Sequence, residues 1–291
     1  MLDLHCHSTA SDGTVPPEKL PAMAREIGLK ALALTDHDTV DGVEAFMAAA
    51  KDVPEIRCLP GIELACRLEN GGHCHIVGLF VDWRNEALQQ LCKQILIWRT
   101  ERNRNILRKL SDLGMPLDYE TLKTQTKGIG DDVVGRPHIA AALVREGYCK
   151  KEKEAFEKYI GRGRPAYCLR EVADGPTCIR AIHDAGGLAI WAHPMTSIDH
   201  SKVEAVAIEL QKNGLDGMEA YYTEFSITQQ NTAIKLAGKL GLALSGGSDF
   251  HGDHHPSIKM GTGYGGLFVP DKLLEDLNRR VDGLHRQHSL L

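Results

Sequence analysis

Long apolar runs are missing from the sequence: no stretch reaches the roughly 18 consecutive apolar residues that a membrane-spanning helix needs. The start of the chain, from Met1 to His5, has no basic segment followed by an extended apolar one, so it lacks the pattern of a cleaved signal peptide. We therefore expect a soluble, cytoplasmic protein that does not associate with membranes.

The cysteines are not paired along the sequence. The 8 cysteines are scattered, with no C-x-x-C motif and no zinc-ribbon spacing, which argues against a redox-active pair and against a cysteine-rich metal site. Reduced thiols fit this pattern, and reduced thiols are typical of cytosolic proteins.

Positive charge is not in excess either. Lysine and arginine number 34 against 39 aspartates and glutamates, which gives a formal net charge of −5. This balance argues against binding to a polyanion through overall charge, so any phosphate group must be held by a local arrangement. The sequence also lacks a G-x-x-x-x-G-K-[ST] motif and thus gives no support for nucleotide binding through a P-loop.

Short apolar runs alternate with amphipathic segments through much of the chain, which is typical of the βαβ units of an α/β protein with a parallel sheet or barrel. Strands are expected at residues 2–5, 31–35, 57–64, 75–80, 188–192, 217–220 and 242–245. Helices are expected at residues 17–27, 41–50 (with Asp41 as the cap), 177–185, 202–213, 228–240 and 270–280.

Residues 85–170 break this alternation, because they read as successive helices with no convincing strand. The expected domains are therefore a discontinuous barrel, 1–84 and 171–291, and a helical insertion, 85–170, that contributes to substrate binding. The first inserted helix carries an apolar stripe that Arg102 interrupts. Residues 128–132 are the best candidate for a mobile loop.

Histidine, by contrast, is abundant at 14 residues. His5 and His7 lie two positions apart at the end of the first expected strand, so both side chains leave the same face and can reach one metal ion. Further histidines and carboxylates fall at or near later strand ends, at Asp12, His37, Glu63, His75, His193, Asp249 and His251. Because the strand ends of a (β/α) barrel converge on one face, we expect all of these side chains to line one pocket. The remaining histidines mostly need no special role.

Imidazole and carboxylate ligands without thiolate suit Mn, Fe or Zn better than a structural zinc or a soft copper site. These groups exceed the ordinary coordination number of a single ion, so the sequence implies two or three divalent ions that share carboxylates. Manganese is our first expectation, with iron or zinc as alternatives.

The order of these motifs resembles that of the PHP (polymerase and histidinol phosphatase) family of phosphoesterases. The resemblance rests on His5-Cys6-His7 with Ser11-Asp12-Gly13, Thr35-Asp36-His37, His193-Pro194 and Asp249-Phe250-His251. It implies a distorted (β/α)7 TIM-like barrel with a trinuclear metal centre. It also implies three ligand sets, namely His5, His7, Glu63 and Asp249; Glu63, His75 and His193; and Asp12, His37 and His251.

Such a centre would attract phosphate, because three divalent ions and three carboxylates sum to a pocket charge of about +3. A bridging water of lowered pKa could then attack phosphorus in line. Asp12 and His37 are the candidate catalytic residues that would protonate the leaving group, although both also belong to the implied metal sets.

The insertion resembles that of the PHP subgroup that acts on nucleotides, through the stretches 99–103, 135–138 and 161–167. Arginine guanidinium groups can bind phosphate oxygens in pairs. We expect substrate contacts from Arg99, Arg102, Asn103, Arg136 and His138.

The leading hypothesis is a phosphatase that removes the 3′-phosphate of nucleoside 3′,5′-bisphosphates to give nucleoside 5′-monophosphates. The alternative is a 5′-to-3′ exonuclease on short RNA or DNA oligonucleotides. A histidinol-phosphate-type phosphatase and a C–N amidohydrolase rank lower, the latter because amidohydrolases usually add a bridging lysine. A non-catalytic metal-binding module is disfavoured by the complete ligand set. The expected partner is a small nucleotide or short oligonucleotide, with no obligate protein partner.

Overall fold

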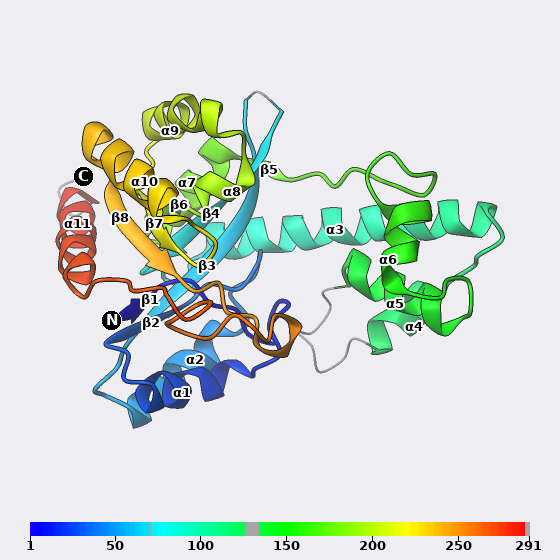
Figure 1. Cartoon of the computed structure of the whole chain (residues 1–291), viewed down its shortest axis with the longest axis horizontal. Coiled ribbons are helices and arrows are strands. Elements are labelled where there is room, and N and C mark those ends of the chain that lie inside the picture. The colour runs from blue at the N-terminus through cyan, green and yellow to red at the C-terminus, as the bar shows by residue number, and fades with distance from the viewer. Residues whose placement is uncertain (70, 126–133, 289–291) are drawn as a thin grey trace. The chain divides into compact units, whose positions relative to one another are not determined.

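A computed structural model describes residues 1–69, 71–125 and 134–288 of the chain, so the loop expected at 128–132 lies outside the described residues. The chain divides into two compact units (Figure 1), of which the first is Met1–Cys92 with Ala173–Leu291 and the second is Lys93–Val172. Among the residues that the structure describes, no helix combines the length and the apolar content needed to cross a membrane.

The first unit is built on one sheet, in the order β1-β2-β3-β4-β6-β7-β8, with the short β5 paired to β3. The strands are β1 Leu2–Asp3, β2 Ala31–Leu34, β3 Arg57–Arg67, β4 His73–Leu79, β5 Ala173–Asp174, β6 Leu188–Trp191, β7 Gly217–Tyr222 and β8 Ala243–Gly247. The seven runs expected to be strands all lie in this sheet, and β5 is an addition to them.

The two ends of the sheet meet, so that it forms a nearly closed barrel. After β1, the Leu4 N–H donates to the Gly246 carbonyl at 3.0 Å, and the Asp249 N–H donates to the His5 carbonyl at 2.9 Å. The buried Asp3 carboxylate joins the same two chain segments, because it accepts hydrogen bonds from the Ser248 N–H at 2.8 Å and the Ser248 hydroxyl at 2.6 Å. This geometry confirms the expected class, an α/β fold with a distorted TIM-like barrel.

Strand β4 departs from the parallel barrel that the sequence pattern predicts. It runs antiparallel to both of its neighbours, β3 and β6, whereas β1–β2, β2–β3, β6–β7 and β7–β8 are parallel pairs. The beginning of β4 therefore lies at the end of the barrel where the parallel strands finish. His75 is near the beginning of β4, and this reversal brings it to the same end as the other candidate ligands.

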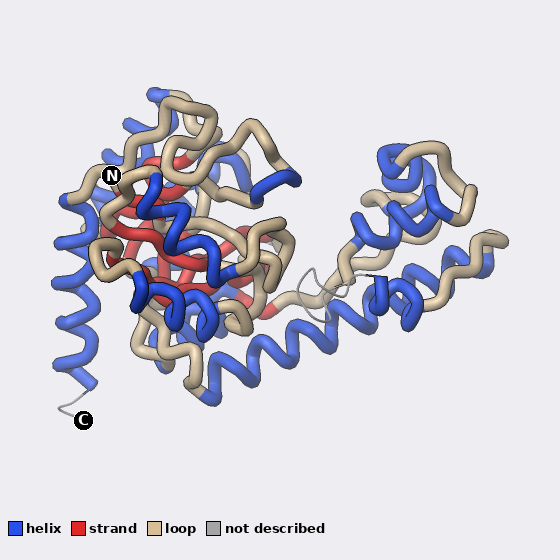
Figure 2. Tube along the Cα trace, turned by 90° about the horizontal axis from the view of Figure 1, so that it is seen from below, coloured by secondary structure: helices blue, strands red, loops and turns tan. Residues whose placement is uncertain are grey.

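Helices surround the strands of the first unit (Figure 2). The α-helices of this unit are α1 Leu20–Glu26, α2 Val43–Ala49, α7 Gly175–Asp184, α8 Pro194–Ser197, α9 Val203–Lys212, α10 Ile227–Leu240 and α11 Lys272–His288. Short 3-10 turns occur at Pro17–Lys19, Ala50–Asp52, His200–Lys202 and Gly252–His254. Asp41 does not cap α2 as expected, because that helix begins after Gly42 without a side-chain cap. Ser226 does cap α10, by accepting the Gln229 N–H.

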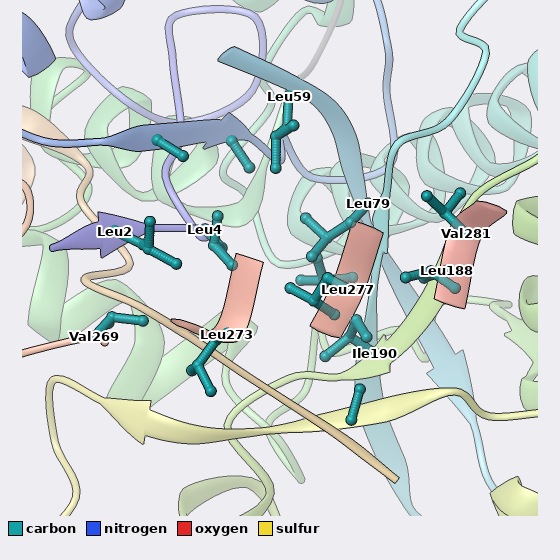
Figure 3. Packing of buried hydrophobic residues seen from close by; sticks show 14 of the residues in the cluster. Leu2, Leu4, Leu59, Leu79, Leu188, Ile190, Val269, Leu273, Leu277 and Val281 are labelled. Atoms are coloured by element: carbon teal, nitrogen blue, oxygen red, sulfur yellow. The ribbon is translucent and has the colours of Figure 1, made fainter. Parts of the chain in front are cut away.

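The core of the first unit fills the barrel and extends to helix α11. Leucine and isoleucine side chains of the strands point toward Leu273, Leu277 and Val281 of that helix (Figure 3). Leu277 is fully buried in this cluster. Burial of one such side chain stabilises the fold by about 1.5–3 kcal/mol. The interior is thus packed with apolar side chains, and the polar candidate ligands are gathered at the strand ends.

The second unit consists of helices among its described residues, and it has a core of its own. Its helices are the end of α3 Glu86–Asp112, α4 Tyr119–Gln125, α5 Arg136–Arg145, α6 Glu152–Ala155 and a π-helical turn at Phe156–Ile160. Ile106, Leu110, Ile139 and Leu143 are fully buried members of one cluster in this unit.

Candidate metal centre

Glu63 on β3 lies at the middle of a group of imidazoles. Its Oε2 atom is 2.8 Å from His37 Nδ1, 3.3 Å from His5 Nε2 and 3.4 Å from His7 Nε2. The carboxylate and the rings of His5 and His7 are buried, and His37 is partly exposed. One carboxylate oxygen therefore faces ring nitrogens from the segments that follow β1 and β2.

The other oxygen of Glu63 faces two histidines from the strands on its other side, β4 and the segment after β6. Its Oε1 atom lies 2.9 Å from His75 Nδ1 and 3.1 Å from His193 Nε2. His75 reaches this position because β4 is antiparallel, and His193 follows β6 directly. Glu63 thus connects ligand candidates from both halves of the sheet.

Asp249, which follows β8, adds a second carboxylate beside the same rings. Its Oδ1 atom is 3.1 Å from His7 Nε2, 3.5 Å from His5 Nε2 and 3.6 Å from His251 Nδ1. Its Oδ2 atom accepts a hydrogen bond of 2.8 Å from the hydroxyl of Tyr222. Asp249 therefore faces the centre with one oxygen and the barrel wall with the other.

Asp12 is the exposed carboxylate of the centre, with 55% of its side chain accessible. Its Oδ1 atom is 3.2 Å from His251 Nε2, and its Oδ2 atom is 3.8 Å from His37 Nε2. The loop that carries it is held by Asp36, whose carboxylate accepts hydrogen bonds from the Ser8 N–H at 2.7 Å and the Ser11 hydroxyl at 2.6 Å.

The structure brings all of the expected metal ligands together at one end of the barrel. Ligand atoms close enough to share an ion occur in three groups: His7, Asp12, His37 and His251; His5, His7 and Glu63; and His37, Glu63 and His75. These groups overlap the expected sets, but His7 also approaches Asp12, and His37 also approaches His75.

Four atoms of this centre are buried without a hydrogen-bond partner among the described residues: His5 Nε2, His7 Nε2, Glu63 Oε2 and Asp249 Oδ1. A buried polar atom left unpaired costs about 1–3 kcal/mol, so four in one place need a common partner. All four are ligand atoms, and the set contains nitrogen and carboxylate oxygen without sulfur, which fits a divalent transition metal.

The pKa values of Glu63 and His7 agree with this chemistry, whereas that of His37 favours a protonated ring when no metal is bound. Burial raises the pKa of Glu63, but the neighbouring imidazoles of His37 and His5 lower it well below its usual range. Burial lowers the pKa of His7 to about 3, together with the nearby His251 and His37. Burial opposes protonation of His37 as well, yet Glu63 and Asp12 raise its pKa to about 10. An ionised Glu63 and a neutral His7 are the forms that ligate metals.

Backbone geometry at the centre is specialised. His193 has φ 33° and Asp249 has φ 57°, both in the left-handed region that residues other than glycine seldom adopt. Gly247, at the end of β8, allows close approach of the segment after β1, because a Cβ atom there would lie 2.4 Å from the His5 backbone nitrogen. Such conformations concentrate at functional sites, where the surrounding structure maintains them.

Three side chains that are not among the expected site residues contact candidate ligands or the loop that carries one. They are Glu219 and Tyr222 of β7 and Asp36 after β2. Glu219 Oε1 lies 2.9 Å from His5 Nδ1. The available signal was a lone acidic residue within the apolar run expected as the strand 217–220. A charged side chain in a buried strand needs a partner of opposite charge or a hydrogen-bond donor. The abundant histidines at the strand ends were the available partners for Glu219.

The expected substrate contacts lie in the second unit, where the structure brings several arginines together. Burial and the charges of Arg136, Arg170 and Arg99 lower the pKa of Arg102 to about 9. Arg102 is 9% exposed, and its Nε atom has no hydrogen-bond partner among the described residues. The guanidinium of Arg136 also lies over the ring of Tyr167, 5.9 Å from its centroid.

The two other expected contact residues of this unit are held by the backbone. Asn103 is fully buried, and its side-chain amide donates to the Val134 carbonyl at 2.6 Å. Its Oδ1 atom has no hydrogen-bond partner in the described part of the chain. His138, near the start of α5, accepts the Gly135 N–H through Nδ1 at 3.0 Å.

Comparison with known proteins places this geometry in context. Residues 3–169 match the sequence profile of the PHP domain. The chain is 37% identical over 250 residues to a 5′-3′ exoribonuclease of Haemophilus influenzae, with 86% of this chain and 89% of the relative covered. It is 32% identical over 253 residues to a 3′,5′-nucleoside bisphosphate phosphatase of Chromobacterium violaceum, with 86% and 87% covered. The crystal structure of a proposed metal-dependent phosphoesterase from Bifidobacterium adolescentis superposes with a TM-score of 0.79 at 26% identity, covering 96% of both chains.

Proposed function

Because the chain belongs to the PHP domain family and is a metal-binding hydrolase of phosphate esters, we propose that it removes the 3′-phosphate of nucleoside 3′,5′-bisphosphates and releases nucleoside 5′-monophosphates. The family, the fold and the class of enzyme predicted from the sequence are confirmed by the comparisons. The choice of substrate is the proposal, and it is supported by the Chromobacterium violaceum relative that carries this name.

The observation that carries the substrate assignment is the arginine cluster of the second unit. Arg102 is buried beside Arg136, Arg170 and Arg99, and like charges so close together repel one another. The buried Nε–H of Arg102 has no acceptor among the described residues, so a bound anion would stabilise it. A phosphate group of a nucleotide can supply two acceptor oxygens to an arginine, so this cluster favours a nucleotide as the substrate.

The metal centre would hold two or three ions, and we assign the ligand sets that the family resemblance implies. Manganese is the proposed metal, with iron or zinc as alternatives. When bound, divalent ions lower the pKa of a coordinated water and neutralise phosphate charge. Glu63 would contribute to two of the sets, since its two oxygens face different rings: Oε2 is 3.3 Å from His5 Nε2, and Oε1 is 2.9 Å from His75 Nδ1.

The chain's own residues must also supply a proton to the leaving oxygen. Asp12 and His37 are the proposed donors, because they are more accessible than the buried Glu63, His5 and His7. Their side chains approach each other at 3.8 Å between Asp12 Oδ2 and His37 Nε2, so a proton held by one is within reach of the other through a small movement. We propose that the enzyme acts in the cytoplasm, where its eight free cysteines stay reduced.

A 5′-to-3′ exonuclease activity on short oligonucleotides is the second candidate. The specific observation in its favour is the 37% identity to an exoribonuclease over 86% of this chain. The same metal centre would serve, because divalent ions can stabilise the charge that develops on the phosphate oxygens during hydrolysis of either a phosphomonoester or a phosphodiester.

The deciding experiment follows phosphate and nucleotide release with Mn²⁺ present. Adenosine 3′,5′-bisphosphate is compared with 5′-phosphorylated RNA oligomers of increasing length. The proposal requires inorganic phosphate and adenosine 5′-monophosphate from the bisphosphate at a higher kcat/KM than mononucleotide release from any oligomer. Mononucleotides from the oligomers without phosphate from the bisphosphate would contradict it and favour the exonuclease.

A further inference from the structure

Strand β7 supplies none of the expected metal ligands, yet it places a carboxylate directly behind them. Glu219 is buried, with 1% of its surface exposed. A buried carboxylate is costly unless charged or hydrogen-bonding groups surround it. Glu219 has both kinds of partner, since Oε1 lies 2.9 Å from His5 Nδ1 and Oε2 accepts the His193 N–H at 2.6 Å. Both partners are residues expected to bind metal.

The contact with His5 determines which nitrogen of that ring is free to bind. His5 Nε2 points to the centre, 3.3 Å from Glu63 Oε2 and 3.5 Å from Asp249 Oδ1. A neutral imidazole carries one proton, so Nε2 offers a lone pair only when the proton is on Nδ1. An ionised carboxylate is an acceptor only, so Glu219 holds the proton on Nδ1 and directs Nε2 to the centre.

The contact with His193 acts on the backbone instead of the ring. His193 has φ 33° and ψ 52° and immediately precedes the short helix α8. Its side chain reaches Glu63 from this conformation, with Nε2 3.1 Å from Oε1. The hydrogen bond from the His193 N–H to Glu219 opposes relaxation to an ordinary backbone conformation. One carboxylate thus orients two candidate ligands that belong to different segments.

An irregularity in β7 directs a second side chain to the same place. The register between β7 and β8 shifts between Glu219 and Tyr221. Such a bulge changes the alternation of a strand and can re-aim the residues that follow it. Tyr222 donates its hydroxyl to Asp249 Oδ2 at 2.8 Å, while Asp249 Oδ1 faces His7 Nε2 at 3.1 Å. The phenol therefore fixes the rotation of a third candidate ligand.

We propose that Glu219 and Tyr222 are positioning residues of the metal centre: β7 sets the tautomer of His5, the backbone of His193 and the rotation of Asp249. The inference rests on the proposed metal centre but not on the proposed substrate. Metal affinity, measured without any substrate, therefore tests it separately from the bisphosphate assignment.

The test is a comparison of Glu219→Gln with Glu219→Asp in the full chain. Glutamine matches the native size, but once its oxygen accepts the His193 N–H, its NH2 group faces His5 Nδ1 and moves the ring proton to Nε2. Aspartate is one methylene shorter but remains an acceptor only. We expect the Mn²⁺ dissociation constant, from competition with a chelator, to rise about 10–100-fold for Glu219→Gln and less for Glu219→Asp. Glu55→Gln, at an exposed residue before β3, is the matched control with wild-type affinity.

A purely structural role for Glu219 predicts the opposite order, because glutamine preserves size and hydrogen-bond count better than aspartate. Wild-type Mn²⁺ affinity in Glu219→Gln, or a greater loss in Glu219→Asp, would overturn the assignment of Glu219. Thermal melting in EDTA shows whether each variant folds without metal. If Glu219→Gln does not fold, Tyr222→Phe decides: a several-fold weaker Mn²⁺ affinity with an unchanged melting temperature in EDTA supports the proposal, and unchanged affinity refutes it.

Discussion

Glu63→Gln is expected to abolish most of the stabilisation that metal gives this protein. Glu63 belongs to two of the three ligand groups, those with His5 and His7 and with His37 and His75, whereas the group around Asp12 does not include it. An ion present at 100 times its dissociation constant stabilises the folded state by about 2.7 kcal/mol. Loss of both groups therefore removes about 2 × 2.7, or roughly 5 kcal/mol, of metal-linked stability.

The assay is thermal unfolding, followed by circular dichroism at increasing Mn²⁺ concentrations, with EDTA as the metal-free reference. At about 2–4 °C per kcal/mol for a domain of this size, the metal-dependent rise in Tm should be roughly 10–20 °C smaller in Glu63→Gln than in the wild type. Asp12→Asn affects one group only and should lose about half as much.

Each variant is measured against its own EDTA curve, so a general loss of stability does not enter the comparison. An unchanged Mn²⁺-dependent rise in Glu63→Gln would refute the reasoning. Equal losses in Glu63→Gln and Asp12→Asn would refute the placement of Glu63 between two groups.

Three further outcomes are expected. Arg102→Gln should raise KM for adenosine 3′,5′-bisphosphate about 10–100-fold, which is the equivalent of one charge-assisted phosphate contact. KM for adenosine 3′-monophosphate should stay unchanged. An equal effect on both substrates would exclude a contact between Arg102 and the second phosphate. Leu277→Ala should lower the free energy of unfolding in urea by about 2–5 kcal/mol because it empties part of the barrel core, whereas Leu169→Ala, at a side chain 71% exposed, should change it by less than about 0.5 kcal/mol. Asp36→Ala should reduce kcat at least about tenfold, because it releases the loop that carries Asp12. Asp41→Ala, at an exposed residue, is the control. Wild-type kcat in Asp36→Ala would show that other contacts hold this loop.

The sequence predicts the strands well, because short apolar runs bounded by turns leave few alternatives. It does not predict the direction of β4, since the period of an apolar run carries no information on chain direction. The sequence analysis grouped His75 with residues at strand ends, although it begins its expected strand. The antiparallel pairing of β4 is what brings His75 to the same end of the barrel as the other candidate ligands.

The candidate ligands are recognisable from the sequence because histidine and carboxylate recur in a distinctive order. The residues that hold them are harder to recognise, because Glu219 and Tyr222 have no comparable motif around them, and Asp36 lies in the motif Thr35-Asp36-His37 without being an expected ligand. Their role depends on contacts between segments far apart in the chain, such as Glu219 with His5 and Tyr222 with Asp249. The spacing of histidines and carboxylates along the sequence therefore identifies the candidate ligands, whereas the contacts that orient their side chains are visible only in the folded structure.

The seam between β1 and β8 has a consequence for the order of folding. The Asp249 N–H pairs with the His5 carbonyl across 249 − 5 = 244 positions. Closing a loop of this length costs about 5 kcal/mol in chain entropy, and such distant contacts form late. During synthesis, His5 and His7 are made well before Asp249, and they cannot enclose an ion with it until the chain between them has left the ribosome. The metal centre is thus completed last, and metal capture would report that the barrel has closed.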